Sequence, residues 1–176
     1  VKSNVDGIAF LMKKNKIDVH QGVGSFVDKN TIKVTAKDGK ETIVTTEKVI
    51  IATGSKPTPL PFAAFDKKRI ISSTEALELK EVPKSLIVIG GGVIGMELGS
   101  VYARLGSKVT VIEFLDSLIP TMDGTMGKEL QKVAKKLGMD VFVGHKVTAV
   151  EVKGNDVTVK AEPKNGGAAL DFKGDY

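Results

Sequence analysis

Three glycines between a short apolar run and a helical pattern constrain the fold of this chain more than any other feature. They are Gly90, Gly92 and Gly95. They follow directly after residues 86–89, a run without polar alternation that is typical of a parallel strand covered on both faces. Apolar side chains then recur at helical spacing over residues 93–105, and residues 108–113 have a second strand pattern. This strand-helix-strand unit predicts the parallel sheet of an α/β fold.

Each glycine has a separate role in such a unit. Gly90 makes the tight turn out of the strand, and Gly92, which has no Cβ, lets a ligand approach the backbone. Gly95 lets the helix lie close to the sheet, and Gly99, one turn later, extends that contact. The first N–H groups of the helix have no internal acceptor and lie at the positive end of the helix dipole. A pyrophosphate is therefore a favourable ligand at this turn.

Glu113 closes the second strand, where a carboxylate can accept hydrogen bonds from the hydroxyls of an adenosine ribose. The same carboxylate would repel a ribose 2′-phosphate, and residues 114–116 include no Arg that would attract one. The pattern predicts an adenine dinucleotide, NAD rather than NADP. The alternative is that the glycines serve only helix–sheet packing and that Glu113 is an ordinary acid at the end of a strand.

The residues before this unit predict a helix and a set of short strands. Residues 3–14 have apolar side chains at helical spacing, with Ser3 or Asn4 as the cap. Asp38-Gly39 predicts a tight primed hairpin turn, because both residues tolerate positive φ. The β-rich runs are residues 18–26, 31–36, 42–46 and 49–52.

A connection rich in proline, residues 53–61, separates these runs from the rest of the chain. We expect a boundary between two lobes from there to Pro83, with a short helix capped by Ser73 or Thr74. After the second strand of the glycine unit, the pattern predicts a helix over 124–137. Short strands are then expected at residues 141–143, 146–153, 157–162 and 170–172.

Composition argues against several classes of function. Apolar residues are 41% and charged residues 27% of the chain, which is typical of a soluble globular protein. The net charge is +5, but the lysines alternate with acids and aromatic residues are only 5%, so we do not expect nucleic-acid binding. There is no cysteine, which excludes a disulfide, a thiolate metal site or a dithiol redox centre within these residues.

Other catalytic or metal-binding patterns have little support. Neither a P-loop nor a G-x-S-x-G sequence occurs. His20 and His145 are isolated from other metal-ligand types in the sequence, and we interpret them as surface or strand histidines. We therefore predict no metal ligand and no catalytic residue in this chain. The chain begins at Val1 without an initiator Met or a signal-peptide pattern, which suggests a piece of a longer protein.

Longer sequence matches give a resemblance to a known family. They are V-I-I-A-T-G-S at 49–55, I-S-S-T-E-A-L at 71–77, V-I-G-G-G-V-I-G-M-E-L-G-S-V-Y-A-R-L-G at 88–106 and V-T-V-I-E-F-L at 109–115. Shorter ones are G-I-A-F-L-M-K-K-N at 7–15, Q-G-V-G at 21–24 and H-K-V at 145–147. With these residues the whole chain resembles the flavoprotein disulfide reductases and, within them, the dihydrolipoamide dehydrogenase family.

The resemblance implies a fold and a set of cofactor contacts. Residues 1–80 would be part of an FAD-binding domain with a small antiparallel sheet. Residues 81–176 would be a Rossmann-like, doubly wound parallel NAD-binding domain that lacks its last strand. The implied contacts to FAD are Gly24, Thr53, Gly54 and Ser55. The implied contacts to NAD are Gly90, Gly91, Gly92, Val93, Ile94, Gly95, Met96, Glu97, Glu113 and Val147. Glu97, by composition alone an exposed helix acid, would lie near the flavin and pair with a lysine from an earlier part of the chain.

The resemblance also implies an activity. The parent enzyme would reoxidise the dihydrolipoamide of 2-oxo acid dehydrogenase complexes through a disulfide and FAD, and it would reduce NAD to NADH. The family's reactive cysteine pair and its His-Glu base are not among these residues, so the chain alone is not expected to be active. The alternatives are another flavoprotein disulfide reductase, for which Arg after Glu113 would signal NADP, and a non-catalytic NAD-binding module.

Partners and location follow from the same resemblance. The parent would form a homodimer and would contact lipoyl domains and the other components of the 2-oxo acid dehydrogenase complexes. It would lie in the mitochondrial matrix of a eukaryote or in the cytoplasm of a bacterium. No nucleic acid and no membrane is expected as a partner.

Overall fold

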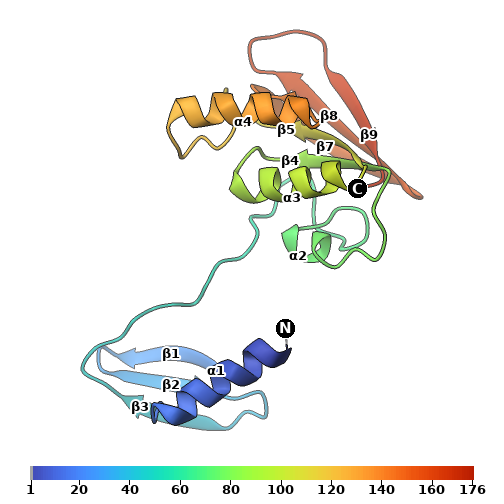
Figure 1. The fold of residues 1–176 in the computed structure, drawn as a ribbon. Helices are drawn as coiled ribbons and strands as arrows, with labels where there is room; N and C mark the ends of the chain where they lie inside the picture. Colours follow the sequence, from blue (N-terminus) through green and yellow to red (C-terminus); the bar gives the residue numbers. More distant parts are fainter. Residues whose placement is uncertain (1) are drawn as a thin grey trace. The chain divides into compact units, whose positions relative to one another are not determined.

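The computed structural model describes residues 2–176, and the chain divides into two compact units (Figure 1). Unit 1 runs to Ser55, and unit 2 is Lys56–Tyr176. All the buried hydrophobic side chains of the described residues belong to unit 2. Unit 2 therefore contains the hydrophobic core.

Unit 1 consists of one helix and a three-stranded antiparallel sheet in the order β1-β2-β3. Its elements are α1 (Lys2–Lys14), β1 (Val23–Asp28), β2 (Thr31–Thr35) and β3 (Glu41–Thr45). The predicted helix is confirmed, but the predicted caps are wrong, because Ser3 and Asn4 lie inside a helix that begins at Lys2. The hairpin between β2 and β3 is confirmed, but only Gly39 has positive φ, so the turn is not of the primed type.

The predicted strand at residues 49–52 does not form. Ile50 is 91% exposed and Ile51 is 70% exposed, and no strand of residues 2–176 pairs with this segment. High β-propensity reflects packing on a pleated surface and is not enough without a neighbouring strand. This apolar run therefore stays extended and unpaired in the structure.

Unit 2 is built on a three-stranded parallel sheet in the order β4-β5-β6. Its strands are β4 (Ser85–Ile89), β5 (Lys108–Ile112) and β6 (Asp140–Phe142), and its long helices are α3 (Val93–Arg104) and α4 (Gly124–Lys136). Each helix connects two neighbouring parallel strands, as the strand-helix-strand pattern predicts. The predicted Rossmann-like α/β architecture is thus confirmed.

Two different layers cover the faces of this parallel sheet. An antiparallel sheet follows β6 and consists of β7 (His145–Lys153), β8 (Asp156–Pro163) and β9 (Leu170–Gly174). Val109 and Val111 pack in one core cluster with the helices, whereas Ile112 packs in a second cluster with β7 and β8. The second face, where a doubly wound fold has helices, is therefore covered by the β7-β8-β9 sheet.

The short helix α2 (Ser73–Ala76) begins one residue earlier than expected. Its N-cap is Ser72 rather than Ser73 or Thr74. The Ser72 hydroxyl accepts from the Thr74 N–H and donates to Glu75 Oε2 at 2.6 Å, and the Ser72 N–H donates to the same oxygen at 2.9 Å. This is a reciprocal capping box. The signal was present in the sequence as Ser72 followed three residues later by Glu75.

This cap predicts a pH-dependent contribution to stability. The hydrogen bonds from Ser72 hold the pKa of Glu75 below its ordinary value of 4.5. A carboxyl group whose pKa is lower in the folded state than in the unfolded state stabilises the folded state at pH values above the unfolded pKa. This stabilisation is lost as pH falls through the folded pKa. We expect Ser72→Ala to lower the unfolding midpoint by about 2–4 °C at neutral pH.

Thermal unfolding of both proteins over a pH series tests this prediction. The difference between them should begin to shrink below pH 4.5, where the unfolded state takes up a proton at Glu75, and should be smallest once the folded state is also protonated at its lower pKa. Thr74→Ala, which removes an exposed side chain but keeps the capped N–H, is the matched control and should behave like the natural protein. A difference that does not change with pH would contradict the role of Glu75.

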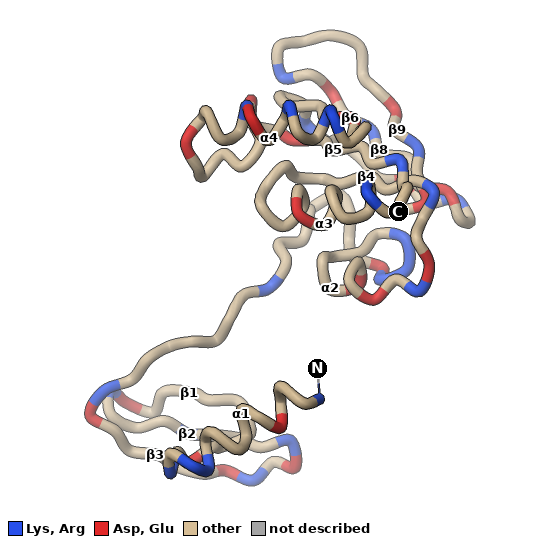
Figure 2. The backbone as a smooth tube through the Cα atoms, in the orientation of Figure 1, with Lys and Arg blue, Asp and Glu red and all other residues tan. Residues whose placement is uncertain are grey.

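Charged residues are mixed along both units. Figure 2 shows Lys and Arg interspersed with Asp and Glu on each of them. Within residues 2–176, no helix is both long enough and apolar enough to cross a membrane.

Candidate dinucleotide-binding site

The turn between β4 and α3 is made by three consecutive glycines, Gly90 to Gly92. Gly90 has φ +111°, a conformation that residues with a Cβ rarely adopt. Its N–H donates to the Ile112 carbonyl on the neighbouring strand at 2.9 Å. The turn is thus anchored to the sheet at its first residue.

Gly92 is the N-cap of α3, and no side-chain hydrogen bond caps this end. A Cβ built at Gly92 would meet nothing within 4 Å, so the space in front of the helix is open. The first N–H groups of a helix have no intrahelical acceptor and carry partial positive charge. Val93 and Ile94 in this first turn are 49% and 61% exposed. An anion can therefore approach the N-terminus of α3 closely.

Gly95 has a different and purely steric requirement. A Cβ at this position would lie 2.5 Å from the Gly90 carbonyl oxygen and 2.9 Å from Val88 Cγ1. A Cβ at Gly99, one turn later, would lie 3.3 Å from Met139 Cε. These two glycines allow α3 to lie against the sheet, which positions its N-terminus at the glycine turn.

Glu113 lies against the same turn. Glu113 is the residue directly after β5, and only 8% of it is exposed. The Gly91 N–H donates to Oε2 at 2.6 Å, and the Leu115 N–H donates to Oε1 at 2.7 Å. Its backbone is also fixed, because its N–H donates to Phe142 and its carbonyl accepts from His145. The carboxylate is held at the glycine turn, and each oxygen keeps a further lone pair for a ligand hydroxyl.

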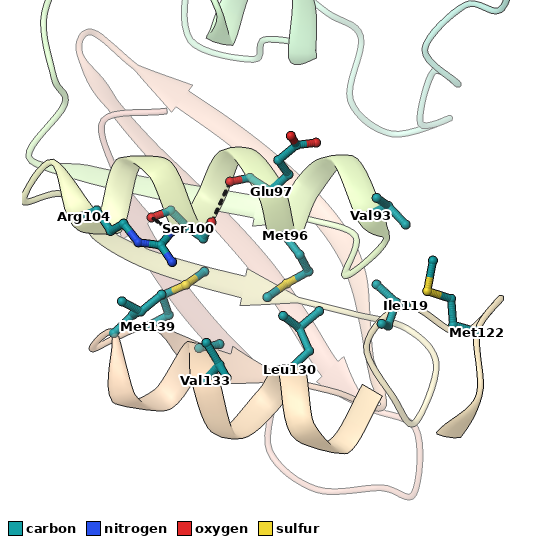
Figure 3. A pocket seen from close by; sticks show the side chains of 12 residues that line it. Val93, Met96, Glu97, Ser100, Arg104, Ile119, Met122, Leu130, Val133 and Met139 are labelled. Atoms are coloured by element: carbon teal, nitrogen blue, oxygen red, sulfur yellow. Dashed lines mark hydrogen bonds between the residues drawn. The ribbon is translucent and has the colours of Figure 1, made fainter. Parts of the chain in front are cut away.

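Some residues predicted to contact NAD face away from the opening. Met96 is 3% exposed, its side chain belongs to the core, and its N–H donates to the Gly92 carbonyl. Val147 is 7% exposed and packs with Ile112 on the β7 side of the sheet. A contact from Val147 to a ligand would have to come from its backbone. Glu97 is exposed, and Figure 3 shows its carboxylate pointing away from α4.

The predicted FAD contacts all belong to unit 1. Gly24 lies on β1, and Thr53, Gly54 and Ser55 lie in an irregular segment; all four are exposed. The predicted NAD contacts all belong to unit 2. Among the predicted contacts, the structure thus brings the residues from Gly90 to Gly95 together with Glu113. The contacts to FAD stay a prediction.

An apolar groove of about 290 Å³ between α3 and α4 is a feature that sequence reasoning did not find. Its side chains are shown in Figure 3. Val93 and Ile119 lie at one end, and Arg104 bonds to the Ser100 hydroxyl at the other. Periodicity places apolar residues on a helix face, but it does not show whether two such faces fill the space between them.

One histidine is a surface residue and the other is a strand residue. His20 is exposed in unit 1. His145 begins β7, and its Nδ1 lies 2.7 Å from the Val143 carbonyl. Across residues 2–176, no three His, Asp or Glu side chains gather in a way that could hold a metal ion.

Comparison with known proteins agrees with this architecture. The family model described as pyridine nucleotide-disulphide oxidoreductase matches residues 1–175. The chain is 48% identical over 170 residues to dihydrolipoyl dehydrogenase 3 of Pseudomonas putida, covering 97% of this chain and 36% of that protein. It is 49% identical over 162 residues to a dihydrolipoamide dehydrogenase of Chaetomium thermophilum, covering 92% of this chain and 32% of that protein.

A solved structure shows the same fold over nearly the whole chain. The crystal structure of LpdA from Mycobacterium tuberculosis matches with a TM-score of 0.86 and 28% identity. The match covers 99% of this chain and 38% of the other. The chain thus spans about a third of the length of the relatives that it matches.

Proposed function

Because this chain belongs to the pyridine nucleotide-disulphide oxidoreductase family, we propose that it is the part of an NAD-dependent dihydrolipoyl dehydrogenase that holds NAD. The observation that carries the proposal is the contact between Glu113 and the glycine turn. It puts a carboxylate and the uncapped start of α3 next to each other. In an adenine dinucleotide the diphosphate is attached directly to the adenosine ribose. One ligand can therefore contact both the carboxylate and the N-terminus of α3.

The residues present fit the adenosine diphosphate half of NAD. The N–H groups at the start of α3 bind the diphosphate, and the open space at Gly92 lets it approach. Glu113 accepts hydrogen bonds from the ribose hydroxyls. Val93 and Ile94 give exposed apolar surface beside the turn, on which the planar parts of the ligand can pack. NAD, when bound, supplies the acceptor for a hydride.

The activity of the whole enzyme is a wider proposal. We propose that the parent reoxidises dihydrolipoamide in 2-oxo acid dehydrogenase complexes, through a disulfide and FAD. The support is that the relatives named dihydrolipoyl dehydrogenase match over almost all of this chain. The contacts to FAD would come from Gly24 and residues 53–55, and residues 1–80 and 81–176 would belong to the FAD-binding and NAD-binding domains.

The partners of the parent follow from the same support. We propose a homodimer that receives electrons from lipoyl domains of the 2-oxo acid dehydrogenase complexes. Relatives occur both in bacteria and, by name, in mitochondria. The location would be the mitochondrial matrix if the source is eukaryotic and the cytoplasm if it is bacterial.

The preference between NADH and NADPH tests the proposed site. A 2′-phosphate would bring negative charge against the Glu113 carboxylate, in a place where only 8% of the residue is exposed. We expect NADH to bind at least about tenfold more tightly than NADPH. Isothermal titration calorimetry of the chain with each dinucleotide measures the ratio. Equal affinities, or tighter binding of NADPH, would contradict the assignment of Glu113.

A further inference from the structure

Ile119 has a backbone conformation that is unusual for its residue type. Its φ is +43°, in the left-handed region that β-branched residues rarely adopt. Pro120 follows, and a residue before proline is normally pushed into extended conformations. Both effects disfavour the left-handed corner that the backbone makes at Ile119, so the surrounding contacts must hold this corner in place.

Both backbone groups of Ile119 are engaged. Its N–H donates to the Gly91 carbonyl at 2.8 Å, and its carbonyl accepts from the Met122 N–H at 2.9 Å. The second bond closes a turn with Pro120 at a favoured position. Asp123, next along the chain, caps α4 by accepting from the Thr125 N–H. The corner therefore connects the glycine turn to the start of α4.

The bond to Gly91 determines where the next N–H points. In a planar trans peptide the carbonyl and the N–H point in opposite directions, so fixing the Gly91 carbonyl also fixes the Gly92 N–H. The N–H groups of Gly90 and Gly91 are already directed to Ile112 and Glu113. Within residues 2–176 no hydrogen bond from the Gly92 N–H to the protein occurs outside the regular helices and strands, so Gly92 is the first donor of the turn that is available to a ligand.

Side-chain packing holds the corner rigidly against the turn. Leu118 is 1% exposed, and its Cδ2 lies 2.5 Å from where a Cβ of Gly91 would be. Ile119 is 8% exposed, and its side chain lies beside Val93 at the end of the groove in Figure 3. The corner cannot move without disturbing the first turn of α3.

We propose that the left-handed corner at Ile119 is a positioning device for the diphosphate site. It orients the Gly91-Gly92 peptide so that the Gly92 N–H points at the diphosphate before the ligand arrives. Ile119 is a positioning residue, because it acts through Gly91 and does not touch the ligand. This inference rests on the proposed function, since it requires that a dinucleotide binds at the glycine turn.

Two variants at the same position separate the corner from the side chain. Ile119→Gly keeps the N–H and tolerates positive φ, whereas Ile119→Pro has no N–H and a φ near −65°. Both lose the isoleucine side chain. In the full chain, we expect Ile119→Gly to bind NADH within about threefold of the natural protein and Ile119→Pro to bind it about tenfold or more weakly.

Competition experiments show whether the effect is on the diphosphate. ADP and adenosine are titrated against bound NADH, followed by NADH fluorescence. The loss in Ile119→Pro should appear for ADP and not for adenosine, which has no phosphate. A general structural defect would weaken both ligands equally, and that result would overturn the proposal. So would an Ile119→Gly protein that binds as weakly as Ile119→Pro.

A backbone change covers the case in which Ile119→Pro does not fold. Replacing residue 119 by the α-hydroxy acid of isoleucine converts its amide to an ester, which replaces the N–H by an oxygen and leaves the side chain in place. We expect a similar loss of ADP affinity with adenosine binding unchanged, and full ADP affinity would overturn the proposal. If NADH binds neither the natural protein nor the ester form, the proposed function itself fails. If NADH binding depends on Glu113 but not on this N–H, only the present inference fails.

Discussion

Gly92→Ala is expected to weaken NADH binding by about 10- to 150-fold, because a displaced diphosphate would lose about as much as one hydrogen bond to a charged group contributes. Alanine fits the protein at this position, since Gly92 has φ −72° and its Cβ would meet no protein atom within 4 Å. The methyl group would instead occupy the space that the diphosphate needs. The unfolding free energy should therefore change by less than about 1 kcal/mol. Calorimetric titration and urea unfolding measure the two effects.

Gly95→Ala is the matched control three residues later. Its Cβ would lie 2.5 Å from the Gly90 carbonyl oxygen, so the helix or the turn must shift. We expect a loss of about 1–3 kcal/mol of unfolding free energy from overpacking, together with weaker NADH binding. The two glycines thus separate ligand access from helix–sheet packing. A Gly92→Ala protein with unchanged NADH affinity would contradict the site.

Glu113→Ala is expected to reduce both stability and NADH affinity. The change leaves the Gly91 and Leu115 N–H groups without their acceptor, at a cost of about 1–3 kcal/mol for each group that stays buried. It also removes the acceptor for the ribose hydroxyls, which should weaken NADH binding about tenfold or more. NADPH should lose less, because a repulsive charge is removed at the same time.

Glu113→Gln is a useful companion variant, because it keeps the size of the side chain and one acceptor oxygen but removes the charge. It should be more stable than Glu113→Ala and should narrow the preference for NADH over NADPH. Titration of both dinucleotides into the two variants gives the ratios. Equal NADH affinity for the natural protein and Glu113→Ala would defeat the ribose assignment.

The parts of the structure that depend on local rules could be predicted from the sequence. A continuous apolar run, a glycine turn and a helical repeat each have a direct backbone consequence, so β4, α3 and β5 formed as expected. The placement of Glu113 at the glycine turn also follows, because adjacent parallel strands end at the same edge of a sheet.

The parts that depend on distant packing could not be predicted. Residues 49–52 have strand propensity, but a strand requires a partner that periodicity does not identify. Met96 and Val147 match the family's pattern, but their side chains turned out to be core residues. The left-handed corner at Ile119 is contrary to the propensity of Ile before Pro, and only tertiary contacts explain it.

The most direct test of the account is an amide NMR titration of the chain with NADH. We expect saturable shifts that are largest at Gly91, Gly92 and Val93, with a second group at Glu113 and Leu115. The amides of β8 and β9 should change little, since they lie on the other side of the parallel sheet. Shifts that are largest in β8 and β9, or no saturable change at the glycine turn, would contradict the claim that this turn binds the dinucleotide.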